Sequence, residues 1–314
     1  MRSRYLFVFF AAVALVFIFF RSPLYSSRSG FFAVNVLQEA SGDCPDLDLH
    51  FSPDSMRPLR LQGSVSLFGE PVPLEDPDVR ERLGRELMVN TFWHSNALLH
   101  FQYANRFFPE VSRVLKEEGV PDDFKYLCLA ESGFRDMVSP SQAVGYWQFL
   151  KETGKRYGLE IREDVDERYH LEKSTRAACA YLKEARQRLG NWTNAAASFN
   201  IGMQGIADRQ NDQRVNSYYD MFLNQETSRY IFRILALKIL FSKPQAAGYQ
   251  VETEDLFQPY TYTSITIDSS IAHIGDFALQ QGLTYKQIKL LNPWLRSARL
   301  SNPDKKTYTI RLMK

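Results

Sequence analysis

Several common catalytic signatures are missing from this 314-residue sequence. Its five histidines are scattered and have no metal-ligand spacing, and no glycine-rich loop is present that would cradle a phosphate. No G-x-S-x-G segment marks a serine nucleophile. The sequence therefore predicts neither a metal site nor a cofactor.

An excess of charge of one sign is also missing. The formal net charge is +2, with 38 Lys and Arg against 36 Asp and Glu. This balance argues against nucleic acid as a partner, because proteins that bind polyanions concentrate positive charge. Aromatic residues make up 14% of the chain, which fits a packed core and would also suit clefts in which sugars stack.

Cysteine is scarce, and the three cysteines have neither zinc-site nor disulfide-scaffold spacing. Their odd number leaves at least one unpaired within the chain. Cys128 and Cys179 fall among apolar residues of expected helices, so we expect small buried core side chains there rather than a disulfide; the third is Cys44.

One long apolar run stands at the N-terminus. Arg2 and Arg4 precede an unbroken apolar stretch over residues 5–20, which as a helix would span roughly 24 Å of a hydrocarbon core about 30 Å thick. No small-x-small cleavage site or lipidation cysteine follows. Residues 1–21 are predicted to be a signal peptide or a membrane anchor, and the rest of the chain is expected to work outside the cytoplasm.

The remaining chain divides into three parts. Residues 22–78 are rich in Ser, Pro and Asp and predict an extended tether laid on the next domain. Residues 79–250 have helical periodicity and predict a mainly α domain. Its first helix is expected to run from residue 79 to Gly119, with a break near Phe108-Pro109.

Later helices of this domain have recognisable ends. One is predicted over residues 173–189 and ended by Gly190. Thr193 is expected to cap a short helix that stops near Gly202, and Glu226 to open the last one.

The C-terminal part, residues 251–314, changes period. "YTYTSITI" and "TYTIRL" alternate like strands, and the two segments between them, "IAHIGDFALQQG" and "YKQIKLLN", have helical patterns. This predicts a small βααβ module. It has no ionisable cluster suited to chemistry, so we expect a binding or packing role.

A glutamate, Glu131, ends the apolar stretch "PDDFKYLCLAESGF". Phe124, Leu127, Cys128 and Glu131 fall at i, i+3, i+4 and i+7 of a predicted short helix, which places the carboxyl on the buried stripe. Burial raises the pKa of a carboxyl and leaves it protonated near neutral pH, as a general acid for a glycosidic oxygen requires. The alternative is a structural glutamate neutralised by an arginine or by backbone donors.

Two further polar segments lie against apolar helices. In "SPSQAVGYWQF", Ser139 and Gln148 flank the Gly145-Tyr146-Trp147 turn, and in "SFNIG", Asn200 follows Phe199. Trp147 is either a core residue or a platform for a sugar ring.

These segments together resemble the lytic murein transglycosylases. The ordered set is "ESGF", "SPSQAVGYWQFL", "TGKRYGL", "VDERYHLEKSTRAACAYL", "NWTNAAASFNIG" and "ETSRYIFRILALKIL", and the resemblance covers roughly residues 73–249. It implies a lysozyme-like α+β catalytic domain over residues 79–250. It also implies non-hydrolytic cleavage of peptidoglycan between N-acetylmuramic acid and N-acetylglucosamine, leaving a 1,6-anhydro sugar.

By this resemblance Glu131 is the single catalytic residue. It would protonate the leaving oxygen and then, as a base, take the proton of the muramic acid C6 hydroxyl as that oxygen attacks C1. The substrate's acetamido group would stabilise C1 in between. One carboxyl that acts as acid and then base needs no second carboxylate at a fixed distance.

The resemblance also assigns supporting residues. The positions implied to bind substrate or support the glutamate are Ser139, Gln148, Asn200, Glu226 and Tyr230, and those implied to shape the cleft are Ser132, Gly145, Trp147 and Phe199. Two departures stand out. Phe199 replaces the usual tyrosine, so a hydroxyl that would contact the substrate or Glu131 is missing, and the interval from Glu131 to Gln148 is one residue shorter than usual.

The C-terminal module is similar to LysM modules, which bind glycans that contain N-acetylglucosamine. "LLNPWL" resembles their "L-x-x-x-N-P" segment, whereas Gly275-Asp276 stand inside the first helix rather than before it. The module is expected to be a degenerate LysM-like unit that either binds glycan or packs on the catalytic domain.

Two alternatives to the transglycosylase hypothesis stay open. A hydrolase of the same fold, like goose-type lysozymes, would need a second carboxylate to position water, with Asp136 and Asp166 as candidates. A non-catalytic peptidoglycan-binding protein would explain the change at Phe199. In each case the expected partner is the peptidoglycan strand, with the membrane as a further partner if residues 1–21 are retained, and the expected location is the periplasm or cell envelope.

Overall fold

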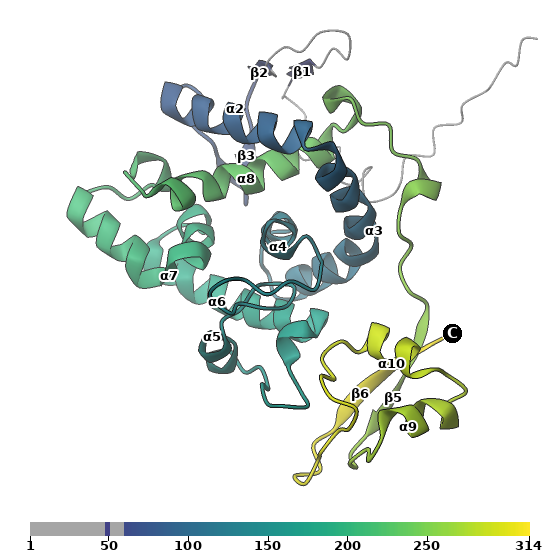
Figure 1. The fold of residues 1–314 in the computed structure, drawn as a ribbon. Helices are drawn as coiled ribbons and strands as arrows, with labels where there is room; N and C mark the ends of the chain where they lie inside the picture. The colour runs from purple at the N-terminus through teal and green to yellow at the C-terminus, as the bar shows by residue number, and fades with distance from the viewer. Residues whose placement is uncertain (1–47, 51–59) are drawn as a thin grey trace, which may run out of the picture. The chain divides into compact units, whose positions relative to one another are not determined.

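The computed structural model describes residues 48–50 and 60–314 (Figure 1). The predicted signal peptide or anchor, the first part of the predicted tether and Cys44 lie outside the described residues. Among the helices that the structure describes, none combines the length and the apolar character needed to cross a membrane.

The end of the predicted tether packs on the helical domain. β1 (Asp48–His50) pairs antiparallel with β2 (Arg60–Gln62), and β3 (Ser66–Leu67) forms a hairpin with β4 (Glu70–Pro71). Phe68, in the turn of that hairpin, is buried and donates its backbone N–H to Asp123 Oδ2 at 2.6 Å. Lys238 Nζ contacts the same Asp123 oxygen at 2.9 Å, so a buried ion pair secures the hairpin.

The first helical stretch divides at a different residue from the one expected. α2 (Pro77–Phe92) and α3 (His94–Glu117) meet at Trp93, whose ψ of 65° is not helical, and Pro109 lies inside α3. The predicted break at Phe108-Pro109 is therefore wrong. Phe108 and Val111 on either side of the proline are buried, and this core packing outweighs the hydrogen bond that a proline removes.

Four further helices complete the main core. They are α4 (Phe124–Ser132), α6 (Leu171–Leu189), α7 (Trp192–Gln213) and α8 (Gln225–Ser242). Figure 1 shows α4 end-on inside the ring of α2, α3, α6, α7 and α8. Every residue of α4 from Phe124 to Leu129 is buried, as expected for a helix surrounded by others.

The helix ends largely follow the sequence. Gly190 ends α6 in the left-handed conformation, and Gly202 interrupts α7 with a φ of 80°. The predicted cap at Thr193 is wrong, because Asn191 takes that role and accepts from Asn194 N at 2.7 Å. Glu226 lies in the first turn of α8, as expected.

Short helices join these elements. They are α5 (Lys151–Arg156) and the 3-10 turns Glu167–Tyr169, Tyr218–Asp220, Gln245–Ala247 and Thr253–Asp255. Cys128 and Cys179 are both free and buried, which confirms the prediction of core side chains.

The C-terminal module has the predicted βααβ order. It consists of β5 (Tyr262–Ile267), α9 (Ile274–Gln280), α10 (Tyr285–Leu291) and β6 (Tyr308–Met313), with β5 and β6 antiparallel. Its core is continuous with residues of the helical domain, since Val144, Val165 and Tyr169 belong to the same buried cluster as Leu295 and Ile310.

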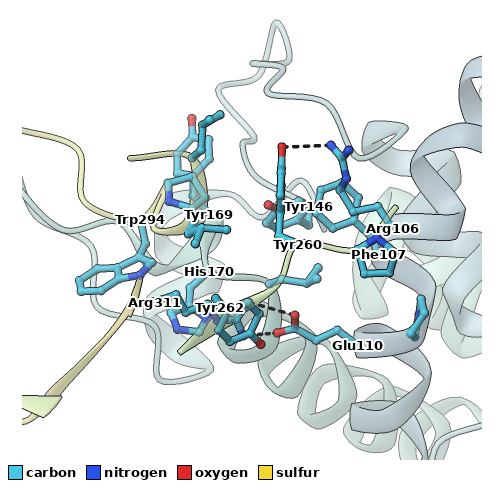
Figure 2. A pocket seen from close by; sticks show the side chains of 16 residues that line it. Arg106, Phe107, Glu110, Tyr146, Tyr169, His170, Tyr260, Tyr262, Trp294 and Arg311 are labelled. Atoms are coloured by element: carbon cyan, nitrogen blue, oxygen red, sulfur yellow. Dashed lines mark hydrogen bonds and ion pairs between the residues drawn. The ribbon is translucent and has the colours of Figure 1, made fainter. Parts of the chain in front are cut away.

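Polar contacts also join the module to the helical domain. Arg311 pairs with Glu110 of α3, with Nη1 to Oε2 at 3.0 Å (Figure 2). Arg296 N donates to Asp164 O at 2.9 Å, and Asp166 N donates to Trp294 O at 2.9 Å. The module is therefore held by backbone hydrogen bonds and an ion pair as well as by apolar packing.

Candidate active site

Glu131 stands one residue before the C-terminal end of the buried helix α4. Leu127, Cys128 and Leu129, which precede it, have no exposed surface, and Gly133 ends the helix with a φ of 58°. The helix therefore delivers a carboxyl group from the middle of the core to the point where the chain leaves it.

Burial changes the acidity of this carboxyl. Desolvation raises the pKa of Glu131 from 4.5 to about 7, since removal from water disfavours the charged form. A hydrogen bond from Tyr230 and the charge of Arg233 oppose this rise, and the charge of Glu226 adds to it. Near neutral pH the group can therefore both give and accept a proton.

α8 joins Glu131 to the cleft. Tyr230, which is buried, donates its hydroxyl to Glu131 Oε1, and Thr227 Oγ1 donates to Asn200 Oδ1 at 2.8 Å. Thr227 and Tyr230 are three residues apart and share a face of α8. Glu131 of α4 and Asn200 of α7 are therefore bound by neighbouring side chains of α8.

A cleft of about 540 Å³ meets this arrangement at Asn200, and its lining does not include Glu131, Thr227 or Tyr230. Three of the residues singled out in the sequence, Gln148, Phe199 and Asn200, line it. Its other lining residues are Phe149, Leu150, Thr153, Arg156, Tyr157, Tyr181, Arg188, Ser198, Ile201, Gly202, Met203 and Gln204. Amide, hydroxyl, guanidinium and aromatic groups thus line one surface, a combination suited to sugar rings.

Phe199 belongs to an aromatic cluster in this wall. Its ring centroid lies 5.1 Å from that of Tyr181, 5.5 Å from that of Phe149 and 6.0 Å from that of Trp147. The hydroxyl that reaches Glu131 comes from Tyr230. A tyrosine hydroxyl therefore contacts the carboxyl even though residue 199 is phenylalanine.

Three of the predicted shaping residues hold the loop that follows α4. Ser132 Oγ donates to Tyr146 O at 2.8 Å, which ties the end of the helix to the Gly145-Tyr146-Trp147 turn. Trp147 is fully buried and donates Nε1 to Thr175 Oγ1 at 2.9 Å, so it is a core residue and not a sugar platform.

Gly145 is required by space as well as by conformation. Its φ is 78°, and a Cβ built on it would lie 2.0 Å from Arg168 O. Only glycine fits, because the left-handed backbone here passes directly against another chain segment.

Ser139 and Gln148 close the same loop. Ser139 Oγ accepts from Ala143 N at 2.9 Å, and Ser139 is absent from the lining of the cleft described above. Gln148 Nε2 donates to Gly145 O at 3.0 Å and to Met137 O at 3.2 Å. Gln148 thus faces the cleft while its amide fixes the loop.

Sequence reasoning missed two contributors to the site. Arg233 lies three residues after Tyr230, and this helical spacing was the available signal for its effect on Glu131. Thr227 was visible only as the middle of "ETSRY", and its contact with Asn200 depends on how α7 packs against α8. Glu226 is exposed and acts on Glu131 through its charge.

The two aspartates considered as second carboxylates lie in different surroundings. Asp166 is buried and paired with Arg168, with Oδ2 2.7 Å from Nη2. Asp136 is exposed and lines a separate groove beside the C-terminal module. Within residues 48–50 and 60–314, no group of three His, Cys, Asp or Glu side chains is arranged to hold a metal ion.

Two regions of the chain match known domain families. Residues 112–222 match the Transglycosylase SLT domain, and residues 263–314 match the Soluble lytic transglycosylase C-terminal LysM-like domain. The chain thus carries an SLT transglycosylase domain, which includes Glu131 and Asn200, followed by a LysM-like domain.

The chain is also homologous to a particular enzyme. It is 23% identical over 232 residues to membrane-bound lytic murein transglycosylase D of Escherichia coli strain K12. These aligned residues make up 72% of this chain and 50% of the relative. The same figures hold for the protein of that name from Escherichia coli O6:H1 strain CFT073. The chain spans about half the length of these curated relatives.

Proposed function

We propose that this protein is a peptidoglycan lytic transglycosylase in which Glu131 acts first as the acid and then as the base. The observation that carries the proposal is a carboxyl at the end of a buried helix, with its pKa raised to about 7 and a tyrosine hydroxyl bound to it. The SLT domain and the relatives' name support the substrate class.

The first step needs the protonated form of Glu131. The carboxyl gives its proton to the oxygen that links N-acetylmuramic acid to N-acetylglucosamine, and the bond from C1 to that oxygen breaks. The positive charge that develops at C1 is stabilised by the acetamido group of the same sugar. General acid catalysis of this kind contributes about 10²- to 10⁴-fold to the rate.

The second step uses the carboxylate left behind. Glu131 removes the proton from the C6 hydroxyl of the muramic acid while O6 attacks C1, which closes the 1,6-anhydro ring and restores the protonated carboxyl. The hydrogen bond from Tyr230 and the charge of Arg233 stabilise the carboxylate between the two steps. Asn200 and Gln148 are proposed to hold the sugars in the cleft.

The hydrolytic alternative needs a carboxylate that activates water at C1. Asp166 is engaged by Arg168, and Asp136 lines another groove, which argues against both in that role. Glu226 raises the pKa of Glu131 through its charge and is the remaining acidic residue to test.

The proposed location is the bacterial envelope, with glycan strands as the partner of both domains. The LysM-like domain is proposed to help hold the strand. Membrane attachment through residues 1–21 remains a prediction from the sequence.

Digestion of purified sacculi, followed by mass analysis of the products, tests the proposal. The wild type should release muropeptides with 1,6-anhydro ends, and Glu131→Gln should lower the rate by about 10²-fold or more. An undiminished rate for Glu131→Gln would remove Glu131 from the mechanism.

A further inference from the structure

A second groove lies on the other side of the loop that follows α4. It has a volume of about 530 Å³ and is formed by residues just after Glu131 together with helix α10 of the LysM-like domain. We call it the interdomain groove. Its lining residues are Phe134, Arg135, Asp136, Gly145, Tyr146, Tyr169, Tyr285, Lys286, Lys289, Leu290, Pro293 and Arg296.

The charge of the interdomain groove is strongly asymmetric. Four cations line it, Arg135, Lys286, Lys289 and Arg296, against the single carboxylate of Asp136. This contrasts with the whole chain, in which the two signs nearly balance. Within the part of the chain that the structure describes, none of these four cations forms an ion pair with a carboxylate. The groove therefore carries positive charge that a ligand would neutralise.

Neutral partners hold three of the four cations in place. Arg135 Nη2 donates to Asn96 Oδ1 at 3.1 Å. Lys289 Nζ donates to the backbone oxygens of Leu295 and Ser297, and Arg296 Nη1 donates to Pro293 O at 3.0 Å. The guanidinium of Arg296 also lies 3.9 Å from the ring centroid of Tyr169. These contacts fix the positions of the cations without cancelling their charge.

A neighbouring cavity, formed between α3 and the LysM-like domain, differs from the interdomain groove in its charge. It is about 260 Å³ in volume and shares Tyr146, Tyr169, Leu290 and Pro293 with the interdomain groove. Figure 2 shows that Arg311 in this cavity pairs with the carboxylate of Glu110, whereas Arg106 contacts the neutral hydroxyl of Tyr260. Two arginines face one carboxylate in this cavity, against four cations and one carboxylate in the interdomain groove, so an anionic ligand is expected in the groove.

The walls also offer apolar surface. Tyr285 and Leu290 on α10 are 41% and 46% exposed and line the groove. A ligand that combines carboxylates with aliphatic groups would cover these side chains and neutralise the cations. A bare neutral sugar would leave the charge uncompensated.

The interdomain groove is within reach of the reaction centre. Arg135 follows Glu131 by four residues, so their Cα atoms are at most about 15 Å apart. Gln148, which lines the cleft, donates to Met137 O at 3.2 Å and so contacts the same loop from the other side. The peptide stems of peptidoglycan, four to five residues long, extend roughly 13–18 Å and hang from the muramic acid at the cut bond.

We propose that the interdomain groove binds the carboxylate-bearing peptide stem of the glycan strand whose sugars lie at Glu131. The proposal rests on the proposed function and extends it, because it gives the LysM-like domain a part in recognising the peptide as well as the glycan. Lys286, which is exposed, is the cation that meets the stem carboxylates, and Arg135, whose guanidinium is held by Asn96, adds its charge to the groove.

Binding of soluble glycan strands by the full chain tests this proposal. All proteins carry Glu131→Gln, and labelled strands with intact stems are compared, by fluorescence anisotropy, with strands stripped of their stems by an amidase. Strands with stems should bind more tightly, and Lys286→Glu should reduce that preference by roughly 3- to 10-fold, the effect expected from reversing one exposed charge in a binding site. Asp136→Asn should increase the preference, and added salt should reduce it.

Lys305→Glu is the matched control, since Lys305 is an exposed lysine of the same domain that lines none of these pockets. Equal affinity for both kinds of strand, or equal behaviour of Lys286→Glu and Lys305→Glu, would overturn the proposal. The proposal would also be overturned if Lys286→Glu lost affinity only for vesicles of anionic phospholipid, because these cations would then bind a membrane surface. Because the binding test needs no cleavage, stem-dependent binding by these variants together with a lack of anhydro products from the wild type would overturn the proposed function alone.

Discussion

At the scale of single residues, the site depends on how the protonation of Glu131 is tuned. Burial raises its pKa, whereas Tyr230 and Arg233 lower it and Glu226 raises it. The balance near 7 suits a group that must lose its proton in one step and regain it in the next. A carboxyl with an ordinary pKa would be deprotonated before the reaction began.

The pH profile of kcat/KM should report this tuning. Activity requires protonated Glu131 and should fall as the pH rises above about 7. Tyr230→Phe removes a hydrogen bond that favours the carboxylate, so the falling limb should move to higher pH. Glu226→Gln removes a repelling charge, so the limb should move to lower pH. Shifts of the same sign in both variants would contradict the assignment.

The ionised carboxylate of Glu131 should lower the free energy of unfolding at alkaline pH. The folded-state pKa of about 7 lies above the ordinary 4.5, so Glu131 contributes stability that is present below about pH 4.5 and is lost as the pH rises through 7. Glu131→Gln resembles the protonated form and should be more stable than the wild type at pH 8, by about 1–3 kcal/mol, but not at pH 4. Denaturant unfolding of both proteins at pH 8 and pH 4 measures this effect. If the variant and the wild type differed in stability by the same amount at both pH values, the carboxyl would have to be solvated.

At the scale of elements, the turn after α4 is set by one glycine. A Cβ at Gly145 would meet Arg168 O at 2.0 Å, and its φ is 78°. Gly145→Ala should lower the free energy of unfolding by about 2–4 kcal/mol, because both strain and a backbone clash arise. Gly158→Ala is the control, since Gly158 also has positive φ but has no atom within 4 Å of a built Cβ. It should lose only about 1 kcal/mol, and equal losses would contradict the clash.

The sequence predicted elements better than their contacts. Helix periodicity located Glu131 on the buried stripe, and glycines marked the ends of α4 and α6, because both signals are local. The break at Pro109 was wrong because core packing on both sides of a proline is not local. For the same reason the bond between Thr227 and Asn200, which joins α8 to α7, could not be foreseen.

At the scale of the whole molecule, the LysM-like domain and the helical domain share a core. Leu295 has no exposed surface, forms an antiparallel bridge with Val165 and packs in one cluster with Val144 and Tyr169. Tyr169 and Gly145 also line the interdomain groove, so this packing sets the shape of a surface close to Glu131. Loss of the shared core should therefore affect both domains.

Leu295→Ala tests whether the two domains unfold together. It should lower the free energy of unfolding by about 2–4 kcal/mol through a cavity in the shared core. Calorimetry should show one transition at a lower temperature. Leu279→Ala, at a position that is 74% exposed in the same domain, should change stability by no more than about 0.5 kcal/mol. A low-temperature transition of the LysM-like domain alone would contradict the shared core.

The origin of the oxygen atom that bonds to C1 tests the proposed mechanism most directly. Sacculi digested by the wild type in water enriched in heavy oxygen should give muramic acid ends that carry no heavy label and are lighter by one water than the hydrolysis product. Glu131→Gln should give almost none of either product. Incorporation of heavy oxygen at C1 would mean that water attacks, and would contradict the assignment of Glu131 as the single acid and base.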